Sequence, residues 1–227
     1  MTRRGWAELL ALVAPPACVA CRAPLARADA LLCAGCLRAL PWLRGSRCPR
    51  CGLPRHRRGG CPAARAAFAQ AWAPMAYEAS ARALVQALKF RGALPVAALM
   101  AAQIAATLPA PLRDGLVVPV PPQRARRRAR GFDPAGALAV ALAPRLGLPL
   151  DAAALARTDR SGRQVRAGRA ARRAPGRIAV AARRELGTRV LLVDDVHTTG
   201  ATLDACASAL VAAGCPCVVA VSYARTL

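Results

Sequence analysis

The segment 190–202 combines the side chains that a sugar phosphate would need. Its sequence, VLLVDDVHTTGAT, places two carboxylates after an apolar run and follows them with hydroxyl groups and glycine. Asp194 and Asp195 repel anions, but carboxylates accept hydrogen bonds from sugar hydroxyls and coordinate Mg²⁺. Small residues at the start of a helix offer backbone N–H groups to a phosphate, and here they are Thr198, Thr199, Gly200, Ala201 and Thr202. The segment predicts a ribose 5-phosphate site; the alternative, carboxylates that only cap a helix, does not explain the loop.

Seven cysteines near the N-terminus form a second group with evident chemistry. They comprise three CxxC pairs and a single cysteine: Cys18, Cys21, Cys33, Cys36, Cys48, Cys51 and Cys61. A CxxC turn brings two thiolates to one side of a loop, and two such turns supply the four ligands of tetrahedral Zn²⁺. The first four cysteines can therefore close one site. The last three leave one position open, for which His56 is either the fourth ligand or a solvated loop residue.

Disulfides and redox catalysis are the competing interpretations of these cysteines. Disulfide frameworks belong to oxidising compartments and usually use an even number of cysteines. This segment has seven, and the N-terminal apolar run is short and interrupted at Glu8, so we expect no export signal. A redox CxxC would lie between a strand and a helix, which these pairs do not. Structural zinc in a cytoplasmic protein is therefore expected, and no apolar run approaches the ~20 residues of a transmembrane helix.

Alternating helix-like and strand-like segments must position these groups. We expect helices at 80–90 with Ser80 as N-cap, at 95–108, at 134–143 ended by Pro144, and at 203–210; we expect strands at 116–120, 190–193 and 218–221. This alternation predicts an α/β fold with a parallel sheet flanked by helices. No cysteine occurs in the 144 residues between Cys61 and Cys206. We therefore predict two domains: an N-terminal helix and zinc-binding module over 1–66, and the α/β domain over 67–227.

Arginine dominates the charge of the chain. It has 34 basic and 11 acidic residues and a net charge of +23, and Lys89 is the only lysine. One cluster comprises Arg124, Arg126, Arg127, Arg128 and Arg130, and a second runs from Arg157 to Arg173 at spacings near three. Such clusters predict contacts with a polyphosphate or a nucleic-acid backbone. The alternatives are a solvated basic face and a bias in genome composition. Only Phe132 lies near for base stacking, so sequence reading is not expected.

The motifs together resemble the ComF (GntX-like) family, which is associated with competence and DNA uptake. The resemblance rests on the paired cysteines, LKFRG at 88–92, VVPVP at 117–121, RGF at 130–132, VDDVHTTGAT at 193–202 and the terminal ARTL. It implies a type I phosphoribosyltransferase-like sheet preceded by a double zinc ribbon-like module. It also implies that Asp194 and Asp195 face the ribose hydroxyls of phosphoribosyl pyrophosphate (PRPP) with Mg²⁺. Residues 198–202 would hold its 5-phosphate, the loop 124–130 its pyrophosphate, and 157–177 would form a mobile cover.

Three departures from the family pattern are visible. Asp133 and Pro134 stand where the family commonly has Asn-Gln, Ala64 stands where relatives often have an eighth cysteine, and Thr198 stands where some purine-salvage relatives have a carboxylate. The last departure argues against base protonation by an acid at that position.

Three functions from different classes compete on the sequence alone. The first is an enzyme, or enzyme-like PRPP binder, that displaces pyrophosphate with an unknown acceptor and uses Asp194 and Asp195 in catalysis. The second is a protein that binds single-stranded DNA during transformation and whose pocket is regulatory or vestigial. The third is a zinc scaffold for protein partners such as the competence machinery. The DDxxTTGxT pattern favours the pocket, and the net charge favours DNA.

Overall fold

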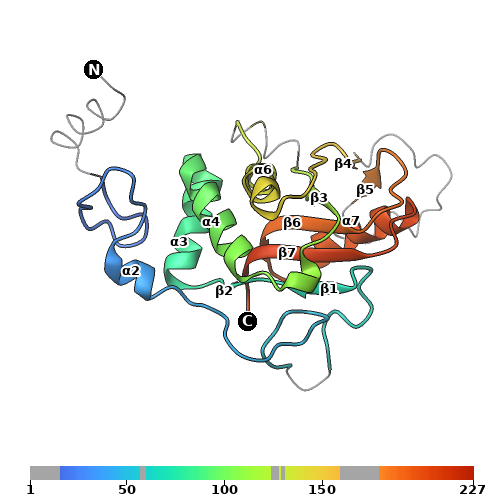
Figure 1. The fold of residues 1–227 in the computed structure, drawn as a ribbon, viewed down its shortest axis with the longest axis horizontal. Helices are drawn as coiled ribbons and strands as arrows, with labels where there is room; N and C mark the ends of the chain where they lie inside the picture. Colours follow the sequence, from blue (N-terminus) through green and yellow to red (C-terminus); the bar gives the residue numbers. More distant parts are fainter. Residues whose placement is uncertain (1–15, 57–59, 124–127, 129–130, 159–178) are drawn as a thin grey trace, which may run out of the picture.

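The computed structural model describes residues 16–56, 60–123, 128, 131–158 and 179–227 (Figure 1). Its centre is a parallel sheet in the order β1-β7-β6-β3, in which β2 also pairs with β7. The strands are β1 (Gln70–Trp72), β2 (Met75–Ala76), β3 (Leu116–Pro119), β6 (Val190–His197) and β7 (Val218–Arg225). The expected parallel α/β architecture is confirmed.

Layers of helix cover both faces of this sheet, which explains the continuous apolar runs of β6 and β7. Alternate residues of β6 point to opposite faces: Leu191 and Val193 join one apolar cluster, and Val190 and Leu192 join the other. The first cluster is completed by α3 (Ala79–Arg91), α4 (Leu94–Thr107) and α6 (Pro134–Leu146). The second is completed by α7 (Ala201–Ala212) and the antiparallel pair β4 (Leu155–Arg157) and β5 (Val180–Ala182). A short 3₁₀ helix, η1 (Ala110–Leu112), precedes β3.

Several expected helix boundaries are wrong. The helix expected at 203–210, α7, is two residues longer at each end. The helix at 134 does not end at Pro144 but continues to Leu146 and is capped by Gly147, which has φ 67°. A proline in the last turn removes only one helical hydrogen bond, and the N–H groups of Gly147 and Leu148 close the helix on the carbonyls of Pro144 and Ala143. Ser80 is not the N-cap of α3, because the helix begins at Ala79 after Glu78, and Ser80 is buried in the first turn.

The cysteine-rich segment packs on the α/β part at two places. Cys18, Leu32 and Leu40 belong to the cluster of α3 and α4, near the short helix α2 (Ala34–Arg38), and Cys51 belongs to the cluster of α7. The Ala67 N–H donates to the Asp204 carboxylate of α7 at 2.7 Å. The domain boundary near residue 66 stays a prediction, and the expected N-terminal helix falls in 1–15, outside the described residues. Within the described ranges, no helix has the length and apolarity needed to cross a membrane.

Candidate functional site

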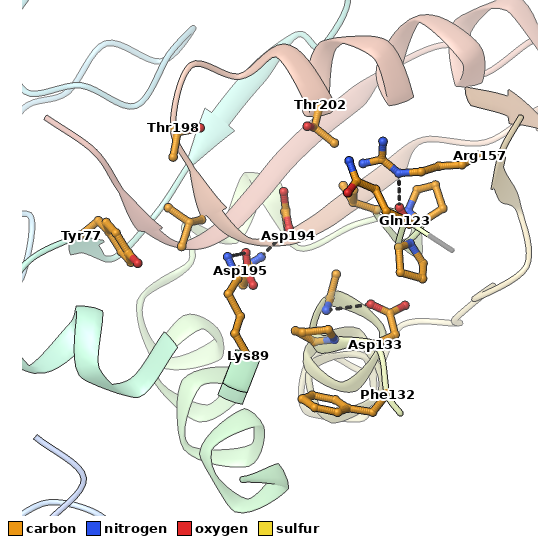
Figure 2. A pocket seen from close by; sticks show the side chains of 16 residues that line it. Tyr77, Lys89, Gln123, Phe132, Asp133, Arg157, Asp194, Asp195, Thr198 and Thr202 are labelled. Carbon is orange, nitrogen blue, oxygen red and sulfur yellow. Dashed lines mark hydrogen bonds and ion pairs between the residues drawn. The ribbon is translucent and has the colours of Figure 1, made fainter. Parts of the chain in front are cut away.

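A pocket of about 330 Å³ opens where β3 and β6 end (Figure 2). The two strands are parallel neighbours, so their carboxyl ends meet at one edge of the sheet, which is where ligands bind in open α/β sheets. Four of the predicted site residues line this pocket: Asp194, Asp195, Thr198 and Thr202. Thr199 and Gly200 lie in the loop before α7 and Ala201 is the first residue of α7, but none of the three is among the lining residues.

The two carboxylates of the pocket are held in different ways. Asp195 is buried, and its Oδ1 lies 2.9 Å from Nζ of Lys89. Asp194 accepts a hydrogen bond from the Asp195 backbone N–H at 2.8 Å through its own Oδ1. Burial and the neighbouring Asp195 carboxylate raise the pKa of Asp194 well above its ordinary value. A divalent cation or hydroxyl donors would stabilise such a crowded pair of acids.

The glycine of the loop is required for a reason that the sequence did not show. Gly200 has φ 84° and is the N-cap of α7, and a Cβ on it would lie 2.7 Å from Nε2 of His197. A side chain at this position would also stand in the way of a phosphate that approaches the backbone. The structure shows that it would first collide with His197, so a Gly200 variant reports on the loop's own packing as well as on any ligand.

Buried groups from outside the loop support it from behind. His197 packs edge-on against Phe68, with ring centroids 5.9 Å apart, and burial followed by the charge of Arg225 lowers its pKa to about 3. Arg225 is also buried and donates from Nη1 to the Thr198 carbonyl at 3.3 Å. The Thr226 N–H donates to the His197 carbonyl. The terminal ARTL motif therefore braces the loop through its arginine and threonine.

The opposite wall of the pocket is formed by the start of α6 and the segment after β3. Asp133 is the N-cap of α6 and accepts a hydrogen bond from Ala135 N–H at 3.1 Å, and Pro134 occupies the first turn. This arrangement is a well-formed helix start, so the departure at these two positions is structurally coherent. Arg157 donates from Nε to the Pro121 carbonyl at 2.9 Å and lines the pocket beside Gln123.

An adjoining pocket of about 460 Å³ shares Arg157 and Asp133 with the first and adds Arg128 and Arg183. It is the place where the structure brings members of both arginine clusters together. Most of the arginines of these two segments lie outside the described residues. They are all members of the second arginine segment after Arg157 and, in the first, Arg124, Arg126, Arg127 and Arg130.

The cysteines form two clusters that fit tetrahedral zinc. We call Cys18, Cys21, Cys33 and Cys36 the first cluster, and Cys48, Cys51, His56 and Cys61 the second cluster; within each, the ligand atoms lie within 4.8 Å of one another. Four thiolates at Zn–S distances of ~2.3 Å would be about 3.8 Å apart. The Sγ atoms of Cys21 and Cys33 are 3.7 Å apart, and those of Cys48 and Cys61 are 3.8 Å apart.

His56 lies beside the three cysteines of the second cluster. Its Nε2 lies 3.2 Å from Sγ of Cys51, and it is close enough to all three cysteines to supply a fourth ligand. Sequence spacing alone could not separate a ligand from a solvated loop histidine. Ala64 is not part of the cluster.

Both clusters begin with the same backbone turn. The N–H of Cys18 donates to the Ala23 carbonyl, and the N–H of Cys48 donates to the Leu53 carbonyl. Backbone N–H groups also point at the first sulfur of each turn: burial raises the pKa of Cys18 and Cys48, but these donors outweigh it and bring the pKa values to about 6 and about 7. A lowered thiol pKa favours the thiolate that binds metal.

Sequence reasoning missed Lys89, Arg225 and His197 as functional neighbours of the pocket. Lys89 was noted only as the single lysine and as part of LKFRG, and Arg225 only as part of ARTL. The available signals were the uniqueness of the lysine and the presence of an arginine at the end of an apolar strand.

The fold and the clusters define an α/β protein with a parallel sheet, a strand-end pocket and a cysteine-rich zinc-binding module. Residues 9–65 match the double zinc ribbon domain family. The chain is similar to the DNA utilization protein YhgH of Salmonella typhi, with 32% identity over 95% of this chain and 100% of the relative. It is 31% identical to the protein of the same name from Salmonella typhimurium, over the same shares of the two chains. The chain belongs to the ComF (GntX-like) family.

Proposed function

We propose that the pocket binds a ribose 5-phosphate ligand, in its full form PRPP with Mg²⁺, and that the protein serves the uptake and use of DNA. One observation carries the first part: two carboxylates and a threonine loop converge on a single pocket at the ends of β3 and β6. A ligand with a diol at one end and a phosphate at the other would pair with the carboxylates and with the threonine loop. Neither of these two groups explains the presence of the other.

Each part of the ligand would meet a group suited to it. Asp194 and Asp195 would accept hydrogen bonds from the ribose hydroxyls and hold Mg²⁺, which supplies compensation for the charge of the pyrophosphate. The loop 198–202 would donate backbone N–H groups to the 5-phosphate at the start of α7. The arginines 124–130, together with Arg157, would neutralise the pyrophosphate.

A catalytic role for Asp194 and Asp195 belongs to the same proposal. When pyrophosphate leaves C1 of the ribose, positive charge develops on the ring, and fixed carboxylates nearby would stabilise it. We expect an acceptor to enter from the second pocket, because this arginine-lined pocket adjoins the first and shares Arg157 and Asp133 with it. The acceptor itself is not identified by these residues.

The DNA part of the proposal rests on the relatives and on charge. Both relatives are named DNA utilization proteins. The net charge of +23 suits contact with a phosphate backbone. Single-stranded DNA and proteins of the competence machinery are therefore the proposed partners. The competing function, a DNA-binding protein whose pocket is only regulatory, is favoured by the arginines that gather around the second pocket.

Calorimetry with PRPP and Mg²⁺ tests the pocket. The parent should bind, and the double variant Asp194→Asn/Asp195→Asn should lose at least ~1.4 kcal/mol, about tenfold, because its charge is removed at constant size. Asp29→Asn is the matched control, since Asp29 forms an exposed ion pair with Arg27 far from the lining residues. Absence of binding in the parent, or equal binding by the double variant, would refute the pocket assignment.

Salt-dependent DNA binding tests the second part. Replacing Arg126, Arg127 and Arg128 by Gln should weaken single-stranded DNA binding equally across sequences and flatten the salt dependence by up to ~0.7 per lost contact. Replacing the exposed Arg27, Arg38 and Arg44 removes the same charge elsewhere and should leave the slope closer to that of the parent. An unchanged slope in the first variant would assign this loop to pyrophosphate or solvent.

A further inference from the structure

The only lysine of the chain lies in the proposed ligand pocket. All 33 other basic residues are arginine, as the sequence shows. Lys89 is in the last turn of α3, and its Nζ reaches Oδ1 of Asp195 at 2.9 Å (Figure 2). A chain that uses arginine at every other basic position has kept an ammonium at this one.

This ion pair differs in burial from the others that the structure describes. The side chains of Lys89 and Asp195 are 25% and 8% exposed, whereas those of Arg27 and Asp29 are 76% and 70% exposed. The pair of Arg184 and Asp151 is intermediate, at 57% and 21%. Exposed pairs contribute little, but breaking a buried pair leaves an uncompensated charge. The lysine pair is therefore the one whose loss should have the largest consequence.

We propose that Lys89 is a positioning residue of the pocket, whose ammonium fixes the Asp195 carboxylate toward the ligand's hydroxyls, and that arginine cannot replace it. This inference rests on the proposed function of the pocket. Asp195 in turn donates its backbone N–H to Asp194, so one ammonium helps to orient both acids. The contact comes from α3, an element that is distant in sequence from the acid motif.

Shape explains why arginine would fail here. An ammonium is a compact point charge, whereas a guanidinium is planar and wider and sits on a side chain that is longer overall. Lys89 already reaches its acid at hydrogen-bonding distance from a position beside the pocket. A guanidinium at this position would either displace Asp195 or project into the space of about 330 Å³ that the ligand needs.

Affinity measurements separate the charge of Lys89 from its shape. In calorimetry with PRPP and Mg²⁺, Lys89→Arg should bind at least fivefold more weakly than the parent, and Lys89→Met at least tenfold more weakly. The matched control is Arg91→Lys, an exposed position two residues further along the same helix, which should bind within twofold of the parent. If the parent binds PRPP and Lys89→Arg binds equally well, this inference fails while the proposed function stands; if the parent does not bind, both fail.

A spectroscopic signature tests the contact without replacing Lys89. Reductive methylation with ¹³C-formaldehyde labels only the terminal amine and Lys89, because the chain has no other lysine. The Lys89 resonance should shift when Asp195→Asn is introduced and again when PRPP and Mg²⁺ are added to the parent. Asp29→Asn should leave the resonance in place. If the chemical shift of Lys89 changes neither with Asp195→Asn nor with the ligand, the proposal is wrong, whatever the stability of the variants.

Discussion

The two cysteine clusters each begin with the same kind of backbone turn, but they lie differently with respect to the pocket. The first cluster packs toward α3 and α4 through Cys18, Leu32 and Leu40, and its Cys21 is exposed. In the second cluster, Cys51 is wholly buried and packs in the same apolar cluster as Phe68, which contacts His197 behind the ligand loop. Two clusters that both fit tetrahedral zinc thus pack against different parts of the protein. We expect the first cluster to stabilise the N-terminal segment, and the second to support the site as well.

The backbone links the second cluster to the sheet as well. The Ala71 N–H of β1 donates to the Pro49 carbonyl at 3.2 Å, and a Cβ on Gly52 would lie 3.0 Å from the Ala71 carbonyl oxygen. Strand β1 pairs with β7, which ends at Arg225. A disturbance of the second cluster therefore has a short physical route to the residues that brace the loop.

The largest expected difference comes from removing one ligand of each cluster. Cys51→Ser should lower the free energy of unfolding by about 4 kcal/mol or more, because it loses a metal ligand and buries an unpaired hydroxyl. It should also weaken PRPP binding at least fivefold. Cys21→Ser should release zinc but leave PRPP binding within twofold, because Cys21 is exposed and its cluster packs in a different apolar cluster from Phe68. Denaturant unfolding, metal analysis and calorimetry on both variants measure this contrast. Equal losses of PRPP affinity would break the comparison.

Acid should act on the link between the second cluster and the pocket. Burial and Arg225 lower the pKa of His197 to about 3, below the ~6.5 of an unfolded chain. Between these two pKa values, His197 binds a proton in the unfolded state but not in the folded state. The free energy of unfolding therefore falls as the pH drops below about 6.5. For this group the loss should be about 2 kcal/mol between pH 7 and pH 5.

The variant His197→Gln separates the contribution of His197 protonation from the release of zinc by acid, because zinc release affects the parent and the variant alike. The difference in unfolding free energy between parent and variant should change by that amount over the same pH range in denaturant titrations. A constant difference would show that His197 is not held neutral behind the loop.

The turn that begins each cluster carries the smallest expected effect, that of Arg22→Gly. The residue after its second cysteine has a left-handed backbone in both clusters: Arg22 has φ 67° and Gly52 has φ 75°. Arg22→Gly should stabilise the protein by ~0.5–1 kcal/mol by relieving this conformation. Gly52→Ala should destabilise it by ~1–3 kcal/mol, since Ala71 also limits the space. Thermal unfolding of the two variants gives both signs; destabilisation by Arg22→Gly would show that the turns are not equivalent.

The long elements were predictable because their apolar patterns are strong. Helices α3 and α4 lie within one residue of expectation, while β6 and β7 run four residues further because their pairing continues to His197 and Arg225. The strands of two or three residues (β1, β2, β4 and β5) were missed, since such short runs carry no periodicity.

The site was predictable where it is contiguous in sequence. The motif 194–202 carries its chemistry in its spacing, and four of its residues do line the pocket. The places of Lys89 and Arg225 beside the pocket depend on contacts between distant segments, and the place of His56 beside the cysteines depends on how a loop folds back. No spacing rule encodes those.

A crystal structure of the protein with ribose 5-phosphate and Mg²⁺ tests the central claim most directly. The account predicts the phosphate within hydrogen-bonding distance of the backbone N–H groups of 198–202, with the ribose hydroxyls facing Asp194 and Asp195. A sugar phosphate bound instead between Arg157 and Arg183, with the threonine loop vacant, would contradict it.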